Sequence, residues 1–166
     1  MGIIEKMRLD EKRIFVTGGA RGIGKSVAEA FAEAGADLAI ADIDIDEAEK
    51  TARDLADRTG RKVIAVQTDV TEPEQVDAMI EQVVSELGGL EAAFCNAGIC
   101  INEPAEEMTF EHWKKVIDIN LTGVYLTAVA AGKYMLKHGG GSIINTASMC
   151  RSLNAHITHQ KQALLC

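Results

Sequence analysis

A glycine-rich turn between a strand and a helix constrains this chain more than any other feature. The strand-like run Arg13 to Val16 is followed at once by Thr17-Gly18-Gly19-Ala20-Arg21-Gly22-Ile23-Gly24. Glycines at such a junction let the backbone turn tightly and approach a pyrophosphate, and the next helix offers its unpaired N–H groups to it. We therefore expect a nucleotide-binding turn at this position.

A carboxylate follows the second apolar run of the chain. Leu38 to Ala41 read as a buried strand, and Asp42 ends it. A carboxylate at that place can accept hydrogen bonds from the hydroxyls of an adenosine ribose. The glycine spacing is T-G-x-x-x-G-x-G, with Gly24 positioned to let the helix pack closely on the strand. The turn and Asp42 together predict a dinucleotide site.

Strand-like and helix-like stretches alternate along the 166 residues, without a linker, a low-complexity tract or an internal repeat. Alternation of this kind predicts a parallel sheet with helices on both faces. We expect strands at 13–17, 37–42, 63–66, 90–95 and 142–146, and helices at 22–34, 46–58, after 71–74 and across 110–137.

Two local patterns give finer predictions. Ile23, Val27, Phe31 and Ala34 recur at helical spacing and predict the buried face of the first helix. Thr71-Glu72-Pro73-Glu74 fits a capping box, in which Thr71 and Glu74 would satisfy opposing backbone N–H groups.

The motifs resemble, in order, those of the short-chain dehydrogenase/reductase family. They are Thr17 to Gly24, Asp69-Val70, Asn96-Ala97-Gly98, Asn120 and Ser148, and the resemblance extends from about Arg8 to Met149. It implies an α/β fold of the Rossmann type, a doubly wound parallel sheet in one domain over residues 1–166. It also implies an oxidoreductase acting on a secondary alcohol or ketone. Gln160 to Leu164 resembles a segment of sugar- and polyol-related members.

The resemblance implies a set of cofactor-binding residues. Asp69 would contact adenine, although by itself it also fits a solvated aspartate ahead of a helix. Cys95 stands where the family has an asparagine, so some polar bracing there would be weaker. The cofactor-binding set is Gly18, Arg21, Gly22, Ile23, Gly24, Asp42, Asp69, Val70, Asn96, Ala97 and Gly98.

Two catalytic residues follow from the resemblance. Ser148 matches the serine that steadies the substrate oxygen, although a serine after a strand is usually a turn residue. Asn120 matches an asparagine that holds a helix irregularity and a water relay. Its alternative is a simple hydrogen bond from helix to strand, because a polar amide inside an apolar helix needs a partner.

The chain departs from the family where the catalytic tyrosine and lysine are expected. Its tyrosines are Tyr125 and Tyr134, both before Ser148, and Leu165 stands at the place of the catalytic tyrosine. We expect a chain that is family-like to about 149, has a divergent tail at 150–166 and lacks the last strands and helices. As such a truncated form it would be inactive. The alternative is a non-catalytic dinucleotide-binding protein, or a gene remnant without a stable fold.

The choice of cofactor depends on two opposed charges. Asp42 would repel the 2′-phosphate of NADP, whereas Arg21 stands where NADP-dependent family members often have a basic residue. Asp42 would bind the ribose directly, so NAD is expected and NADP is disfavoured.

Composition restricts the partners and the compartment. The net charge is −8 with no basic cluster, so nucleic acid is not expected. The start has no signal-peptide pattern and no window could span a membrane, so we expect a cytoplasmic protein with free thiols. Cys150, His156, His159 and Cys166 match no zinc pattern, and no metal is predicted. A small alcohol or ketone is the expected substrate, and a homo-oligomer is compatible with the sequence.

Overall fold

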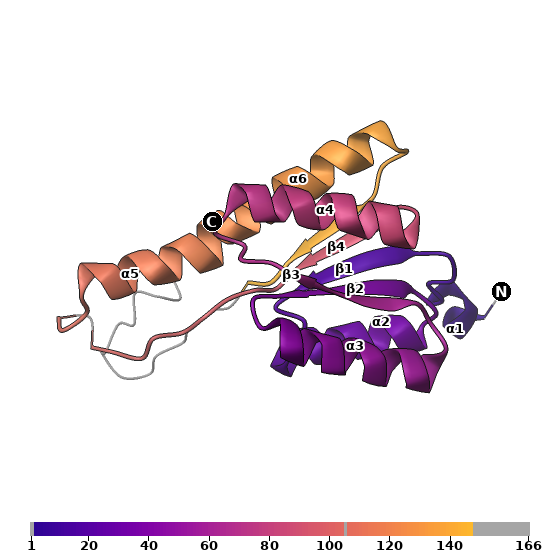
Figure 1. Cartoon of the computed structure of the whole chain (residues 1–166), viewed down its shortest axis with the longest axis horizontal. Coiled ribbons are helices and arrows are strands. Elements are labelled where there is room, and N and C mark those ends of the chain that lie inside the picture. The colour runs from indigo at the N-terminus through magenta and orange to yellow at the C-terminus, as the bar shows by residue number, and fades with distance from the viewer. Residues whose placement is uncertain (1, 105, 148–166) are drawn as a thin grey trace.

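The computed structural model describes residues 2–104 and 106–147. Its strands form one parallel sheet in the order β3-β2-β1-β4-β5 (Figure 1). The chain builds outward from β1 to β3 and then returns to add β4 and β5 on the other side, which confirms the doubly wound Rossmann-type sheet. The strands are β1 (Arg13–Thr17), β2 (Asp37–Asp42), β3 (Val63–Gln67), β4 (Ala92–Cys95) and β5 (Ser142–Asn145).

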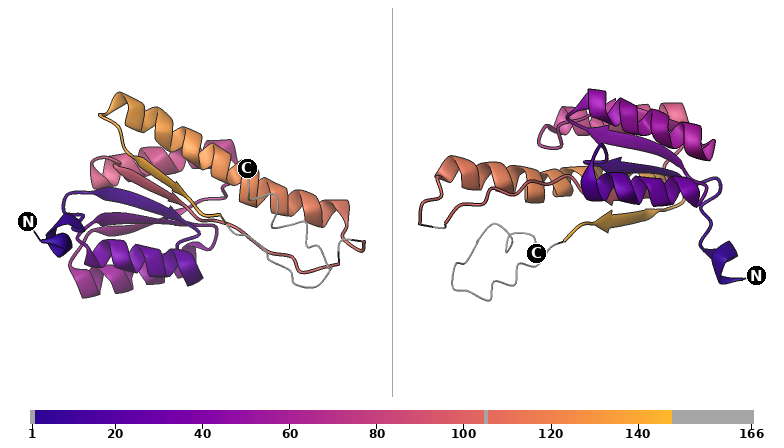
Figure 2. Two further views of the ribbon diagram at one scale, coloured as in Figure 1. Left: turned by 180° about the vertical axis from the view of Figure 1, so that it is seen from behind. Right: turned by 90° about the horizontal axis from the view of Figure 1, so that it is seen from below.

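Helices cover both faces of the sheet. In Figure 1, α2 and α3 lie below it and α4 and α6 above it. In Figure 2, α5 extends beyond the sheet in line with α6. The helices are α1 (Ile3–Lys6), α2 (Gly22–Glu33), α3 (Ile45–Thr59), α4 (Pro73–Leu87), α5 (Phe110–Ile117) and α6 (Val124–Lys137), with the π-helix η1 (Asp118–Gly123) between the last two.

The two faces of the sheet each have their own core. Side chains alternate along a strand, so Ile14 and Val16 pack toward α2 and α3 while Phe15 packs toward α4 and α6. All three are buried. Strands covered on both sides need apolar residues at every position, which explains why they read as continuous apolar runs.

The buried face of α2 is not the predicted one. The fully buried residues are Gly24, Ala28 and Ala32, whereas Ile23 is 68% exposed. The true face is turned by one residue because small side chains bring the helix close to the sheet. Phe31 packs only partly against this core.

The predicted capping box at Thr71 is wrong. Helix α4 has Glu72 at its N-cap position and no side-chain cap. The Thr71 hydroxyl instead donates to Asp69 Oδ1 at 2.7 Å, and the Gln75 side chain accepts from the backbone N–H of Asp69 at 2.9 Å. The nearby carboxylate is the stronger acceptor for Thr71, so the hydroxyl turns away from the helix.

The long helical region expected over 110–137 is present and is divided by the π-helical turn η1. Gly123 is the last residue of η1, and a Cβ on it would lie 2.6 Å from Val70 Cγ2, so this turn packs directly against the loop after β3.

Strand β5 forms the edge of the described sheet, and Ile143 and Ile144 on it are 38% and 44% exposed. Three strand bounds also differ: β3 continues to Gln67, β4 begins at Ala92, after the buried Leu90, and β5 ends before Thr146.

Candidate functional site

A cleft of about 1050 Å³ opens at the carboxyl ends of the strands. Ligands of open parallel sheets bind at this edge, next to the point where the strand order reverses. Nine of the predicted cofactor residues line the cleft, namely Gly18, Arg21, Ile23, Asp42, Asp69, Val70, Asn96, Ala97 and Gly98. The α5 and η1 side of the cleft is formed by Glu111, Lys114, Lys115, Asp118 and Ile119.

The glycine turn brings its backbone against two neighbouring segments. Gly18 has a left-handed φ of 62°, and a Cβ there would come within 2.9 Å of Ala97 Cα. A Cβ on Gly24 would lie 2.1 Å from the Gly18 carbonyl oxygen and 2.7 Å from Asn96 Nδ2. Only glycine fits at these positions, because any side chain would push α2 away from β1 and β4.

The N-terminus of α2 has no side-chain cap. Arg21 takes the N-cap position with extended backbone, and its side chain makes no capping hydrogen bond. Gly22, with a φ of 55°, begins the helix, and Ile23 lies at the cleft. The first N–H groups of a helix carry a partial positive charge and need acceptors. This end of α2 therefore suits an anionic group such as a pyrophosphate.

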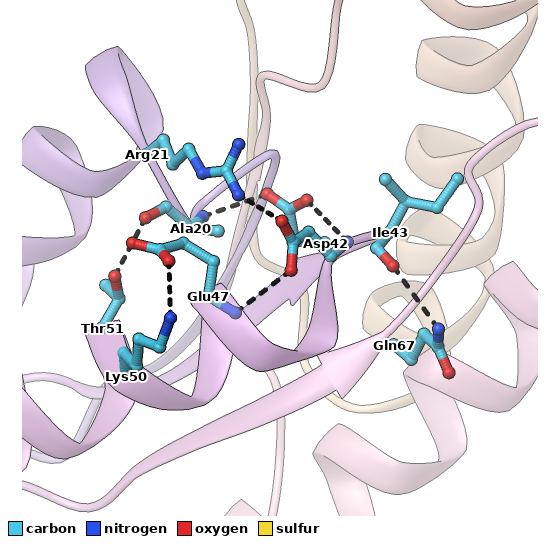
Figure 3. Close-up of polar contacts among 9 residues, drawn as sticks. Ala20, Arg21, Asp42, Ile43, Glu47, Lys50, Thr51 and Gln67 are labelled. Carbon is cyan, nitrogen blue, oxygen red and sulfur yellow. Dashed lines mark hydrogen bonds and ion pairs between the residues drawn. The ribbon is translucent and has the colours of Figure 1, made fainter.

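Asp42 links the glycine turn to the start of α3. Its Oδ2 accepts from the Ala20 N–H at 3.1 Å, and its Oδ1 accepts from the Asp44 N–H at 3.1 Å (Figure 3). Arg21 forms an ion pair with Asp44. The Asp42 carboxylate is thus held in one orientation at the cleft, where it can still accept hydrogen bonds from a ligand.

Asn96 and Thr17 join β4 to the glycine turn. The buried Thr17 hydroxyl accepts from the N–H groups of Asn96 at 3.0 Å and of Ala97 at 3.2 Å. Asn96 Nδ2 donates to the carbonyl oxygens of Thr17 and Gly18, both at 3.2 Å. The Thr146 hydroxyl, which follows β5, donates to Asn96 Oδ1 at 3.4 Å. The strand ends are therefore braced by polar side chains as well as by the sheet.

The loop after β3 places the buried hydroxyl of Thr68 at the cleft. Asp69 and Val70 line the cleft, and Asp69 Oδ1 also accepts from the Thr71 N–H at 2.9 Å. Thr68 lines the cleft as well, and its buried Oγ1 has no hydrogen-bond partner in the part of the chain that the structure describes. A buried polar atom without a partner is costly, so the cleft suits a ligand that carries polar groups. The uncapped α2 N-terminus and the close backbone packing at the glycines fit a dinucleotide equally well.

The two predicted catalytic residues have different outcomes. Asn120 is buried within η1, and its amide exchanges two hydrogen bonds with the Ile99 backbone, each of 2.8 Å. The expected helix irregularity is therefore present at Asn120, and its partner is a loop residue rather than a strand residue. Ser148 lies outside the described residues, as does the tail at 150–166.

Cys95, where the sequence resemblance implies an asparagine, packs as an apolar residue. It is 1% exposed and belongs to the core between the sheet and α4 and α6. Burial away from water disfavours the thiolate and raises the pKa of Cys95 to about 12. The bracing at this strand end comes instead from Thr17, as described above.

Three contributors to the site were not predicted. Asp44 caps α3 by accepting from the Glu47 N–H at 3.2 Å, and the spacing from Asp44 to Glu47 is a helix-start signal that could have identified it. The buried Thr51 donates to the Ala20 carbonyl oxygen at 2.9 Å, and Thr17 anchors the loop after β4. Thr17 ends the apolar run of β1, which is a signal for it, whereas Thr51 stands among charged residues and has no such signal.

Two absences concern the described residues only. Residues 2–104 and 106–147 hold no group of three or more His, Cys, Asp or Glu side chains that could hold a metal ion. The candidate set of Cys150, His156, His159 and Cys166 falls outside them. The helices of the described segments are all too short or too polar to span a bilayer.

Comparison with known proteins agrees with this geometry. The chain is 37% identical over 155 residues to D-threitol dehydrogenase of Mycolicibacterium smegmatis, covering 92% of this chain and 59% of that protein. It is 41% identical over 143 residues to galactitol 2-dehydrogenase of Agrobacterium fabrum, and the match covers 86% of this chain and 54% of that protein. Identity is 32% over 160 residues to the NAD-dependent glycerol dehydrogenase of Listeria innocua, covering 95% and 61%. The chain spans less than two thirds of these relatives.

Solved structures show the same fold. A short-chain type dehydrogenase/reductase from Mycobacterium marinum superposes with a TM-score of 0.93 at 39% identity, covering 99% of this chain and 68% of that one. The NADPH-dependent 3-quinuclidinone reductase of Rhodotorula rubra superposes with a TM-score of 0.87 at 29% identity, covering 99% and 63%. The family model for short chain dehydrogenases matches residues 12–157, so this chain belongs to the short-chain dehydrogenase/reductase family.

Proposed function

We propose that this chain is the cofactor-binding part of a dehydrogenase that uses NAD(H) and acts on a secondary alcohol or the matching ketone. Sugars and polyols are the proposed substrate class, because two relatives are named for threitol and galactitol. The observation that carries the proposal is the fixed carboxylate of Asp42 at the cleft, beside the uncapped start of α2. A cytoplasmic location is also proposed, since a buried thiol such as Cys95 suits a reducing compartment.

Asp42 supports NAD over NADP. Its orientation, set by the N–H groups of Ala20 and Asp44, would let it accept hydrogen bonds from the ribose hydroxyls. The 2′-phosphate of NADP would place a second negative charge beside the Asp42 carboxylate. Two unit charges at about 4 Å repel by about 1 kcal/mol in water and by about 4 kcal/mol near a protein surface.

The other predicted residues take separate parts of the cofactor in this proposal. The backbone at Gly18, Gly22 and Gly24 would hold the pyrophosphate, together with the N-terminus of α2. The loop at Asp69 and Val70 would receive adenine, and Asn96 to Gly98 would line the ribose side. NAD supplies the hydride acceptor when bound.

The 166-residue chain is proposed to bind NAD without measurable turnover. Both tyrosines of the sequence lie in α6, where Tyr134 stacks on His138 with ring centroids 4.0 Å apart. General acid/base catalysis contributes about two to four powers of ten, and the described residues hold no tyrosine at the cleft to supply it. Asn120 is assigned a positioning role, because both ends of its amide hydrogen-bond to the Ile99 backbone.

The second candidate is a protein that binds a dinucleotide and performs no reaction. The lining of the described cleft contains no tyrosine, and this observation favours it. A remnant without a stable fold is the third reading, and a cooperative urea transition would exclude it. A homo-oligomer stays a prediction.

Calorimetric titration of the 166-residue protein with NAD⁺ and NADP⁺ tests the proposal. NAD⁺ should bind more tightly, and Asp42→Ala should weaken NAD⁺ about tenfold or more while removing the preference. The matched control is Asp46→Ala, an exposed acidic residue in the first turn of α3. Equal binding of both nucleotides by the unmodified protein would contradict the role of Asp42.

Absorbance at 340 nm with D-threitol, galactitol and glycerol tests the proposed lack of turnover. Robust NADH formation that disappears in Ser148→Ala would overturn it, because another group would then be serving as the base.

A further inference from the structure

An ion pair joins the glycine turn to the start of α3 beside the Asp42 carboxylate. Arg21 lines the cleft and its guanidinium binds Asp44 Oδ2. In Figure 3 the Arg21 side chain reaches toward the segment that holds Asp42. The other basic residues at the described cleft, Lys114 and Lys115, come from α5 on its far side. Among the basic residues that line the described cleft, Arg21 is therefore the one that lies on the Asp42 side.

Asp44 is held by contacts that do not involve Arg21. Its Oδ1 accepts from the Glu47 N–H at 3.2 Å as the N-cap of α3, and its own N–H donates to Asp42 Oδ1 at 3.1 Å. The N-terminal end of a helix also stabilises a negative charge. Asp44 is thus a fixed anion, whereas the Arg21 side chain is 66% exposed and can move.

We propose that Asp44 is a second determinant of cofactor selectivity, which acts by holding Arg21. The inference rests on the proposed function. An arginine beside the ribose would neutralise a 2′-phosphate and donate two hydrogen bonds to it. While Asp44 binds the Arg21 guanidinium, the positive charge and the N–H donors of that guanidinium are already engaged. Asp42 repels the 2′-phosphate of NADP, and Asp44 keeps the Arg21 guanidinium from binding that phosphate. Both residues therefore favour NAD.

The substitution Asp44→Asn isolates this effect. Asparagine is as good an N-cap as aspartate, so α3 keeps its start while the charge that holds Arg21 is lost. Thermal melting of the variant checks that the fold is retained. NADP⁺ affinity should rise about threefold to fivefold at low salt, and the gain should shrink at high salt.

A double-mutant comparison separates the two ways in which Asp44 could act. If Asp44 merely repels the 2′-phosphate, then Asp44→Asn raises NADP⁺ affinity equally in the Arg21→Gln background. If it acts through Arg21, that gain disappears when Arg21 is replaced. Asp46→Asn is the matched control, because it removes one exposed charge from the same helix turn, and it should leave the NADP⁺ affinity unchanged.

The outcomes distinguish this inference from the proposed function. Wild-type protein that binds neither nucleotide overturns both. Wild-type protein that binds NAD⁺, combined with no NADP⁺ gain in Asp44→Asn or a gain that persists without Arg21, overturns the role of Asp44 alone. A gain that requires Arg21 supports it.

Discussion

The side-chain amide of Asn120 and the backbone of Ile99 are joined by a reciprocal pair of hydrogen bonds. Asn120 Nδ2 donates to the Ile99 carbonyl oxygen and Asn120 Oδ1 accepts from the Ile99 N–H, both at 2.8 Å. Asn120 lies in η1 and Ile99 lies in the loop after β4, at the cleft. The π-helical turn and the loop that forms one wall of the cleft are therefore held as a unit.

Replacing this amide should destabilise the fold. Asn120→Ala leaves the N–H and C=O groups of Ile99 without their partner, and Ile99 is half-buried at the cleft. Each lost hydrogen bond contributes about 0.5–1.5 kcal/mol, so we expect a loss of about 1–3 kcal/mol in the free energy of unfolding, measured by urea denaturation. Lys133→Ala, an exposed change on α6, is the control and should cost little. A loss no larger than that of the control would show that Ile99 finds other partners.

A methyl group at Gly24 should force α2 away from the sheet. The added Cβ would lie 2.1 Å from the Gly18 carbonyl oxygen, so Gly24→Ala should cost about 1–3 kcal/mol through overpacking. The matched change is Gly132→Ala inside α6, where the nearest atom, Ile143 Cδ1, lies 3.7 Å away. That variant should gain about 0.5–1 kcal/mol from helix propensity. The difference between the two melting temperatures is the test.

Stability should fall in alkaline solution because of Cys95. Burial raises the pKa of Cys95 from its ordinary value of 9.0 to about 12. Above pH 9 the unfolded chain loses this proton while the folded chain keeps it, so the stabilisation declines as the pH rises toward 12. The decline is at most about 1.4 kcal/mol per pH unit. Urea titrations between about pH 8 and 10 should show a shallower slope of unfolding free energy against pH for Cys95→Ala than for the unmodified protein.

Acid should weaken the ion pair that ties the start of β1 to the residue ahead of β4. Burial alone would raise the pKa of Glu91, but hydrogen bonds from the side chain and backbone of Arg13 outweigh it, so the pKa lies below 4.5. A lowered carboxyl pKa gives stability that is present above pH 4.5 and lost as the pH falls below it.

The test of this ion pair is Glu91→Gln. We expect a loss of about 1–2 kcal/mol near neutral pH and a flatter stability profile below pH 4.5. Glu81→Gln, an exposed change on α4, should keep the profile of the unmodified protein. Identical acid profiles for Glu91→Gln and the unmodified chain would contradict the assignment to Glu91.

Local patterns in the sequence were sufficient for the architecture. The run from Arg13 to Thr17, the glycines after it and Asp42 at the end of β2 depend on neighbouring residues, and the structure has each where it was predicted. Alternating strands and helices imply a parallel sheet because the crossover connection has a preferred hand. The sequence was therefore enough to predict where the cleft lies.

Tertiary structure decided which hydrogen-bond and ion-pair partners the polar side chains have. Arg21 binds Asp44, Thr17 receives the loop after β4, and Asn120 meets Ile99 across 21 residues of sequence. The buried face of α2 was turned toward Gly24 because close packing selects the smallest residues, not the most apolar ones. Periodicity records only what is adjacent along the chain, whereas a hydrogen bond or a close backbone contact depends on what folding brings together.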